Sequence, residues 1–154
     1  MVLGVLEHAL RHTAPRGRAQ IETKVPHRGI MLLLDRVLWT SDGFDRGVAI
    51  KHVRADEFWT SGHFPGDPVM PGVLLAEAGA QLACYLHNSR STVPQTPAFA
   101  RIDQCSFRNA VRPGQDLYLI CEEVRWTPKR FVCQIHGMVN ERVAFESRIA
   151  GVVL

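Results

Sequence analysis

The chain has 154 residues, which fits one domain with a single core, and 46% of its residues are hydrophobic, as in an ordinary globular protein. Its 15 arginines and three lysines face 15 acidic residues, giving a formal charge of +3, and no run of one sign is present. Such a surface could attract an acidic partner, but a nucleic-acid binder would usually show a concentrated basic stripe or a known motif. We therefore expect a single domain over residues 1–154.

Compartment and membrane contact can be judged from the cysteines and the apolar stretches. The four cysteines lack CxxC spacing and the density of a small secreted scaffold, so we expect buried thiols in a reducing compartment and no disulfide. The apolar start contains Glu7 and His8 and has no basic region before it, unlike a signal peptide. No stretch is long and apolar enough to cross a bilayer. A cytoplasmic protein without membrane or nucleic-acid partners is expected.

The first 24 residues are predicted to form an N-terminal helical arm. Apolar residues between positions 2 and 12 recur at the i, i+3, i+4 spacing of an amphipathic helix, and Pro15-Arg16-Gly17 ends the pattern. We expect this arm to pack on the body of the protein or on a partner subunit.

Two strands are predicted before the centre of the chain. An apolar turn or short helix leads into the first, at residues 37–39, and Ser41-Asp42-Gly43 forms the turn that follows. The second strand covers residues 46–53, and alternation puts Val48 and Ile50 on one face.

A loop and a helix follow. Residues 55–72 are dense in glycine and proline, and Pro71 stands where a first-turn proline belongs. Residues 73–86 are almost uninterruptedly small or apolar, which predicts a helix buried on all sides. Residues 89–97, with two prolines, are expected to form an exposed loop.

The second half of the chain reads as long strands with short turns. They are expected at residues 99–108, 117–126, 131–139 and 142–153, as an antiparallel meander. A helix too apolar for solvent needs a curved sheet over most of its surface. The predicted fold class is therefore α+β, with a six-stranded antiparallel sheet wrapped around one central helix.

Glu77 is the only acidic residue within the apolar helix. Burying an unpaired carboxylate is costly, which favours a protonated acid that can donate a proton. Gln81, one turn further on, lies on the same helical face and could hold the carboxyl group. The alternative is that Glu77 points to solvent or pairs with an arginine.

His63 is the second candidate catalytic residue. The surrounding glycines and prolines, from Gly62 to Gly72, fix an irregular backbone of the kind found at functional sites. The alternative is a loop histidine with a purely local hydrogen bond.

The start of the helix supplies a third component. The unpaired amides of Gly72 and Val73 are suited to a carbonyl oxygen that gains negative charge. A base, an acid and such donors fit removal of a proton α to a carbonyl with expulsion of a β leaving group, which needs no metal or organic cofactor. Metal binding is a weaker alternative because HExxH and Cys/His spacings are absent, and hydrolysis by a nucleophile lacks a GxSxG motif.

The central motif resembles a known family. It reads His63-Phe64-Pro65-Gly66-Asp67-Pro68-Val69-Met70-Pro71-Gly72-Val73-Leu74, followed by Glu77-Ala78 and Gln81. This is similar to the signature of bacterial 3-hydroxyacyl-[acyl-carrier-protein] dehydratases of the FabZ/FabA type, which have the hot-dog fold. Pro26-His27-Arg28 and Leu33-Leu34-Asp35-Arg36-Val37 resemble the N-terminal motif of that family, and Val111-Arg112-Pro113-Gly114-Gln115 resembles the turn after its helix.

The resemblance implies roles for individual residues. His63 would remove the C2 proton of a 3-hydroxyacyl thioester, Glu77 would protonate the leaving hydroxyl, and the Gly72 amide would bind the thioester carbonyl. Phe64, Val73 and Gln81 would complete the substrate site. Glutamate at position 77 is typical of the FabZ type, whereas Asp67 is closer to the isomerising branch.

The resemblance also implies partners. The substrate would be carried on the phosphopantetheine arm of an acyl carrier protein, with no other cofactor. Two subunits would share each site, histidine from one and acid from the other, and dimers could assemble into hexamers. Four basic residues are candidates for contact with the acidic carrier protein: Arg108, Arg112, Lys129 and Arg130. The alternative is that they are solvated strand ends.

The sequence departs from the family at three places. Gly29-Ile30-Met31 replaces a proline and an aromatic residue, residues 93–97 replace an aromatic-rich gate, and the N-terminal arm is long. The preferred acyl-chain length therefore stays open. So does the pathway, which could be fatty-acid synthesis or a specialised acyl pathway. Two other functions are considered: a hot-dog thioesterase in which Glu77 activates water, and an inactive acyl-binding subunit.

Overall fold

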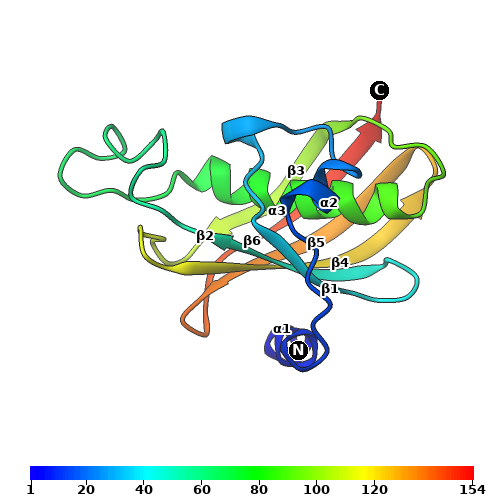
Figure 1. Ribbon diagram of the computed structural model, residues 1–154, viewed down its shortest axis with the longest axis horizontal. Coiled ribbons are helices and arrows are strands. Elements are labelled where there is room, and N and C mark those ends of the chain that lie inside the picture. The colour runs from blue at the N-terminus through cyan, green and yellow to red at the C-terminus, as the bar shows by residue number, and fades with distance from the viewer.

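A six-stranded antiparallel sheet curves around one long helix in the computed structural model, which describes all residues 1–154 (Figure 1). The spatial order of the strands is β1-β2-β4-β5-β6-β3. Their bounds are Arg36–Thr40 for β1, Arg46–His52 for β2, Pro97–Phe107 for β3, Asp116–Thr127 for β4, Arg130–Val139 for β5 and Arg142–Val153 for β6. The predicted α+β class and number of strands are confirmed.

The central helix, α3 (Gly72–Ser89), lies on the concave face of the sheet. Every residue from Gln81 to Asn88 is buried. A β-carbon added at Gly79 would lie 2.5 Å from Ile135 Cγ2, so the helix approaches the sheet too closely for any larger residue. The predicted helix is confirmed, but burial on all sides is wrong for its first turn, where Val73 is 75% exposed.

The start of the N-terminal arm covers the opposite, convex face of the sheet (Figure 1). Its first helix, α1 (Val2–Arg11), buries Leu6 and Ala9 in a separate small core, which also contains Leu38, Val48, Ile50, Ile120 and Met138. The arm therefore packs on the body of its own chain. A second short helix, α2 (Arg18–Glu22), follows within the predicted arm, and it lies on the other side of the sheet, where Ile21 is buried in the core that contains α3.

The alternation predicted for the second strand is explained by these two layers. Val48 and Ile50 share a face, as expected, and that face lies under α1. Ala49 belongs to the larger core that contains α3. Strand β2 is therefore buried on both faces along most of its length.

The predicted four-strand meander is wrong for its first strand. Only β4, β5 and β6 are consecutive neighbours, whereas β3 pairs with β6 at the far edge of the sheet. The reason is that β2 pairs with β4 over seven residue pairs and occupies the position that a meander would give to β3. One side of β3 is consequently left as an unpaired edge.

Two loops flank α3. The loop before it, residues 53–71, extends beyond the sheet at the N-terminal end of the helix (Figure 1). At the other end Asn88 anchors the loop after the helix, because its side chain bonds to both the amide and the carbonyl of Gln95. None of the helices combines the length and the apolar character needed to span a membrane.

Candidate active site

His63 is held by the loop that precedes α3. Its amide donates to the Trp59 carbonyl at 2.9 Å, and its own carbonyl accepts from the Val69 amide at 2.8 Å. Further upstream the buried ammonium of Lys51 lies 2.9 Å from Glu57, which also accepts from the Trp59 indole at 3.1 Å. These paired polar groups hold the loop against the sheet, so its many glycines and prolines do not imply a flexible loop.

The hydrogen bonding of His63 fixes its tautomer. Nδ1 lies 2.6 Å from the Val69 carbonyl, which can only accept, so Nδ1 carries the proton. Nε2 then has a free lone pair and makes no hydrogen bond within the chain. The Phe64 ring stacks on the imidazole, with centroids 4.1 Å apart. The expected alternative of a local hydrogen bond is present, and it is the contact that leaves Nε2 available as a base.

The start of α3 lies beside His63. The Pro71 carbonyl accepts from Leu74 and Leu75, whereas the amides of Gly72 and Val73 precede the first helical hydrogen bond. A β-carbon at Gly72 would lie 2.9 Å from the Phe107 ring, so a larger residue there would have to displace that ring. A groove of about 430 Å³ is lined by His63, Val69, Met70, Gly72, Val73, Leu75, Phe107, Arg108, Asn109, Ala110 and Val111.

Glu77 lies in a different place. Its side chain is 20% exposed and opens into a cavity of about 130 Å³. The cavity runs along one face of α3, past Ala80 and Cys84, and Phe131 lines its wall. Glu77 therefore neither points freely to solvent nor pairs with an arginine, which were the two alternatives.

Two side chains contact the carboxyl group, both at Oε1. Gln81 Nε2 donates to it at 2.9 Å, as the helical spacing predicted. His27 Nε2 lies 3.1 Å from the same oxygen, a contact that sequence reasoning missed. The only signal was the Pro26-His27-Arg28 motif, because 50 residues separate His27 from Glu77. Oε2 is left without a hydrogen bond.

The chain does not bring His63 and Glu77 together. The groove that contains His63 and the cavity that contains Glu77 share no lining residue. The first meets β3 at Phe107 and the second meets the same strand at Pro97, Ala98 and Phe99. Within one chain, His63 and Glu77 thus open into two separate cavities at opposite ends of one edge strand.

Comparison with known proteins identifies the family. Residues 25–148, most of the chain, match the FabA-like domain. The chain belongs to the FabA-like domain family. It is 46% identical over 107 residues to the 3-hydroxyacyl-[acyl-carrier-protein] dehydratase FabZ of Geobacillus thermodenitrificans, covering 69% of this chain and 73% of that protein. It is 44% identical to FabZ of Bacillus cereus strain AH820, covering 69% and 74%.

Solved structures support the same fold. The dehydratase heterocomplex ApeI:P from Xenorhabdus doucetiae superposes with a TM-score of 0.76 at 17% identity, covering 87% of this chain and 90% of that chain. The hot-dog fold expected from the motif is confirmed for this FabA-like chain.

Cys84 is the only thiol in the Glu77 cavity of this FabA-like domain. Burial, with a smaller contribution from the nearby Glu77 carboxylate, raises the pKa of Cys84 to about 12. The thiol therefore stays protonated near neutral pH and contributes apolar wall surface.

The four candidate carrier-contact residues lie in two groups. Arg108 and Arg112 are at the His63 end, where they pair with Glu146 and Asp67 respectively. Lys129 is in the turn between β4 and β5, and Arg130 is the first residue of β5, at the other end of the sheet. Neither has an acidic partner. The four residues were predicted to form one contact surface. Within one chain they lie at two opposite ends of the sheet.

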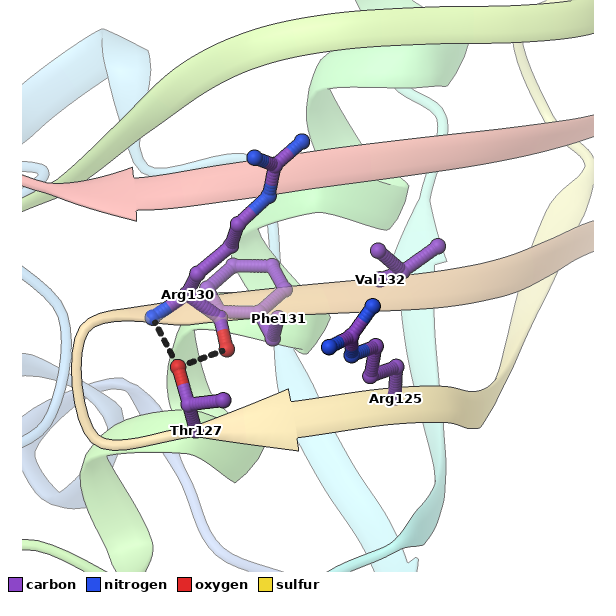
Figure 2. Close-up of a pocket in the computed structure, with 5 residues that line it drawn as sticks. All are labelled: Arg125, Thr127, Arg130, Phe131 and Val132. Atoms are coloured by element: carbon purple, nitrogen blue, oxygen red, sulfur yellow. Dashed lines mark hydrogen bonds between the residues drawn. The ribbon is translucent and has the colours of Figure 1, made fainter.

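Arg130 belongs to a basic cavity of about 260 Å³ (Figure 2). Arg125 contributes from β4, and Thr127 Oγ1 closes the turn through hydrogen bonds with the amide and carbonyl of Arg130. Phe131 lines this cavity and also the Glu77 cavity. The basic surface thus borders one end of the candidate site.

Proposed function

We propose that this chain dehydrates (3R)-3-hydroxyacyl-[acyl-carrier-protein] thioesters to trans-2-enoyl thioesters in fatty-acid or related acyl-chain synthesis. The observation that carries the proposal is a pair of free atoms: Nε2 of His63 and Oε2 of Glu77. Each belongs to a side chain whose other polar atom is already hydrogen-bonded. Such a pair suits one proton removal and one proton delivery.

His63 acts as the base. Its Nε2 lone pair takes the C2 proton, and the electrons of that C–H bond form an enolate-like thioester. The Gly72 amide donates to the thioester oxygen as negative charge develops there, helped by the positive end of the helix dipole. Phe64 and Val73, both largely exposed beside this position, contribute substrate contacts.

Glu77 acts as the acid. The enolate electrons form the C2–C3 double bond as the C3–O bond breaks, and the proton from Oε2 converts the leaving hydroxyl into water. The cycle closes when the proton held on His63 returns to Glu77. Only protein groups and the substrate take part in these steps, and the phosphopantetheine arm of the carrier protein delivers the acyl group.

The complete site forms between two copies of the chain. Edge strand β3 exposes Phe99, Ile102 and Phe107, an apolar edge that invites pairing. Antiparallel pairing of β3 with its own copy about a two-fold axis near Ile102 puts residues 97–99 of one chain beside Phe107 of the partner subunit. The Glu77 cavity of one chain then adjoins the His63 groove of the other.

The same symmetry would unite the basic residues. Lys129 and Arg130 lie at the Pro97 end of the sheet, next to which the pairing puts Arg108 of the partner subunit. We propose that an acidic acyl carrier protein docks at this rim. Arg125, Lys129 and Arg130, which lack ion pairs, provide most of the free positive charge there.

The test follows the reverse reaction. A trans-2-enoyl carrier-protein thioester is incubated with the protein, and loss of the conjugated absorbance reports hydration. We expect His63→Ala and Glu77→Gln each to lower the rate by about 10²–10⁴-fold. His12→Ala and Glu7→Gln, which change exposed residues of the N-terminal arm, are the matched controls. An inactive wild-type chain, or full activity in either site variant, would refute the proposal.

The same assay separates the thioesterase alternative. Hydrolysis would release free thiol, which a disulfide reagent detects, whereas hydration leaves the thioester intact. Thiol release that depends on Glu77 without loss of the conjugated absorbance would favour the thioesterase. Ligand binding without either signal would favour an inactive acyl-binding subunit.

A further inference from the structure

His27 is the neighbour of Glu77 to which the proposed chemistry assigns no role. It lies between α2 and η1 (Gly29–Met31), and its Nε2 is 3.1 Å from Glu77 Oε1, within reach of a hydrogen bond. Both side chains line the same cavity. His27 Nδ1 is buried and has no partner.

The surroundings of the ring favour one tautomer. A proton on Nδ1 would bury a donor without an acceptor, which is unfavourable. A proton on Nε2 faces Glu77 Oε1 and leaves only a lone pair on Nδ1 unmatched. Neutral His27 with its proton on Nε2 is therefore the form that fits the cavity.

Two N–H groups then point at one oxygen of Glu77. Gln81 Nε2 donates one hydrogen to Oε1 at 2.9 Å and the other to the Met31 carbonyl at 2.7 Å. With His27 as the second donor, both lone pairs of Oε1 are used, so the acidic proton resides on Oε2.

We infer that His27 is a positioning residue for the proposed dehydration, acting through Glu77. With Gln81 it orients the carboxyl group so that the proton sits on Oε2, facing the leaving hydroxyl. The inference rests on the proposed function, because it assigns a task to the proposed acid.

The backbone around His27 is fixed well enough for this task. The guanidinium of Arg28 donates to the carbonyls of Val25 and His27, both at 2.7 Å, and to the Glu22 carbonyl at 2.9 Å. The Asn88 side chain donates to the Lys24 carbonyl at 2.6 Å. The segment that carries His27 is thereby closed on itself and held against the C-terminal end of α3.

The test compares two substitutions at His27 in the enoyl hydration assay. His27→Phe keeps a ring but removes the donor, and His27→Gln keeps an N–H donor but changes the shape. We expect the phenylalanine variant to lose kcat by about 10- to 100-fold, the worth of one hydrogen bond to a charged or reacting group, with KM nearly unchanged. The glutamine variant should stay within about fivefold of wild type.

The opposite ranking would overturn the inference. If His27→Phe keeps the wild-type rate, or if His27→Gln loses as much as His27→Phe, the ring contributes packing and not a donor. Thermal unfolding and sedimentation check that each variant is folded and assembled. His27→Met, which is apolar and has no donor, replaces the phenylalanine variant if that variant does not fold.

A double-mutant cycle shows whether His27 acts through Glu77. In a Glu77→Gln background, His27→Phe should lower the residual rate by less than about twofold, because the group that it positions is already gone. If the rate losses of the two single variants multiply in the double variant, the two residues act independently and the inference is overturned. Failure of the proposed function gives a different result, since the wild-type protein would then be inactive or Glu77→Gln would keep full rate.

Discussion

Gln81 donates a hydrogen bond to Glu77 within one turn of α3, at 2.9 Å from the carboxyl oxygen. The same fully buried carboxamide accepts from the Leu33 amide at 2.9 Å. Gln81 therefore links Glu77 to the segment before β1, and a change at Leu33 or at Glu77 should alter the position of the other residue.

Replacing Gln81 with leucine should damage stability and turnover together. The variant leaves the buried Leu33 amide without an acceptor, which costs about 1–3 kcal/mol, and it removes the donor of the Met31 carbonyl. Urea unfolding measures the first effect and the hydration assay the second. Gln134→Leu, on β5, is the size-matched control, and equal behaviour of the two variants would contradict the expectation.

Complementation between inactive chains tests the shared site. A heterodimer of His63→Ala and Glu77→Gln chains has one site with both intact residues and one site with neither. We expect co-expressed mixed dimers, purified with two different tags, to recover about half the wild-type rate per dimer. If each site lay within one chain, both sites would carry a defect and no activity would return.

Charge reversal at the turn between β4 and β5 tests carrier docking. Lys129→Glu with Arg130→Glu should raise KM for the carrier-bound substrate, and the difference from wild type should shrink in high salt. The rate with a short pantetheine thioester, which lacks the carrier protein, should not change. Equal losses with both substrates would indicate damage to the site instead of lost docking.

The wall of the Glu77 cavity should set acyl-chain length. Ala80 and Cys84 follow Glu77 along the same face of α3, so a larger residue at position 84 narrows the cavity about 10 Å beyond the acid. Cys84→Leu should lower kcat/KM for a long acyl chain while a four-carbon substrate keeps its rate. An unchanged ratio between the two chain lengths would contradict this placement.

His136 on β5 should contribute to pH-dependent stability. Burial lowers its pKa below the usual 6.5, although the nearby carboxylates of Glu146 and Glu122 partly oppose the effect. As the pH falls below about 6.5, the unfolded chain takes up the proton before the folded one does, so stability is lost on acidification.

The decrease in the free energy of unfolding that His136 causes cannot exceed about 1.4 kcal/mol per pH unit. Urea unfolding at pH 7.5, 6.5 and 5.5 should show a shallower decline for His136→Gln than for wild type. Parallel declines in the two proteins would assign the pH dependence to other groups.

Some features follow from the sequence because their causes are local. The apolar run after Pro71 predicts α3, and the four-residue spacing predicts the contact between Glu77 and Gln81. The dehydratase motif spans only His63 to Gln81, so its residues can be recognised without knowing how the chain folds. The helix and the candidate acid, base and amide donors could thus be named from the printed chain.

The remaining features depend on pairings between distant segments. The position of β3 follows from competition with β2 for the edge of β4, which no local pattern encodes. His27 reaches Glu77 only because the segment before β1 folds across α3.

The sequence by itself determined which groups could do the chemistry, since residue type and spacing decide what can donate, accept or form a helix. Only the tertiary structure decided that His63 and Glu77 open into separate cavities at opposite ends of β3. The physical reason is that an edge strand keeps unpaired N–H and C=O groups along one side. Which strand forms the edge, and in which direction those groups point, is known only once the order of the sheet is known.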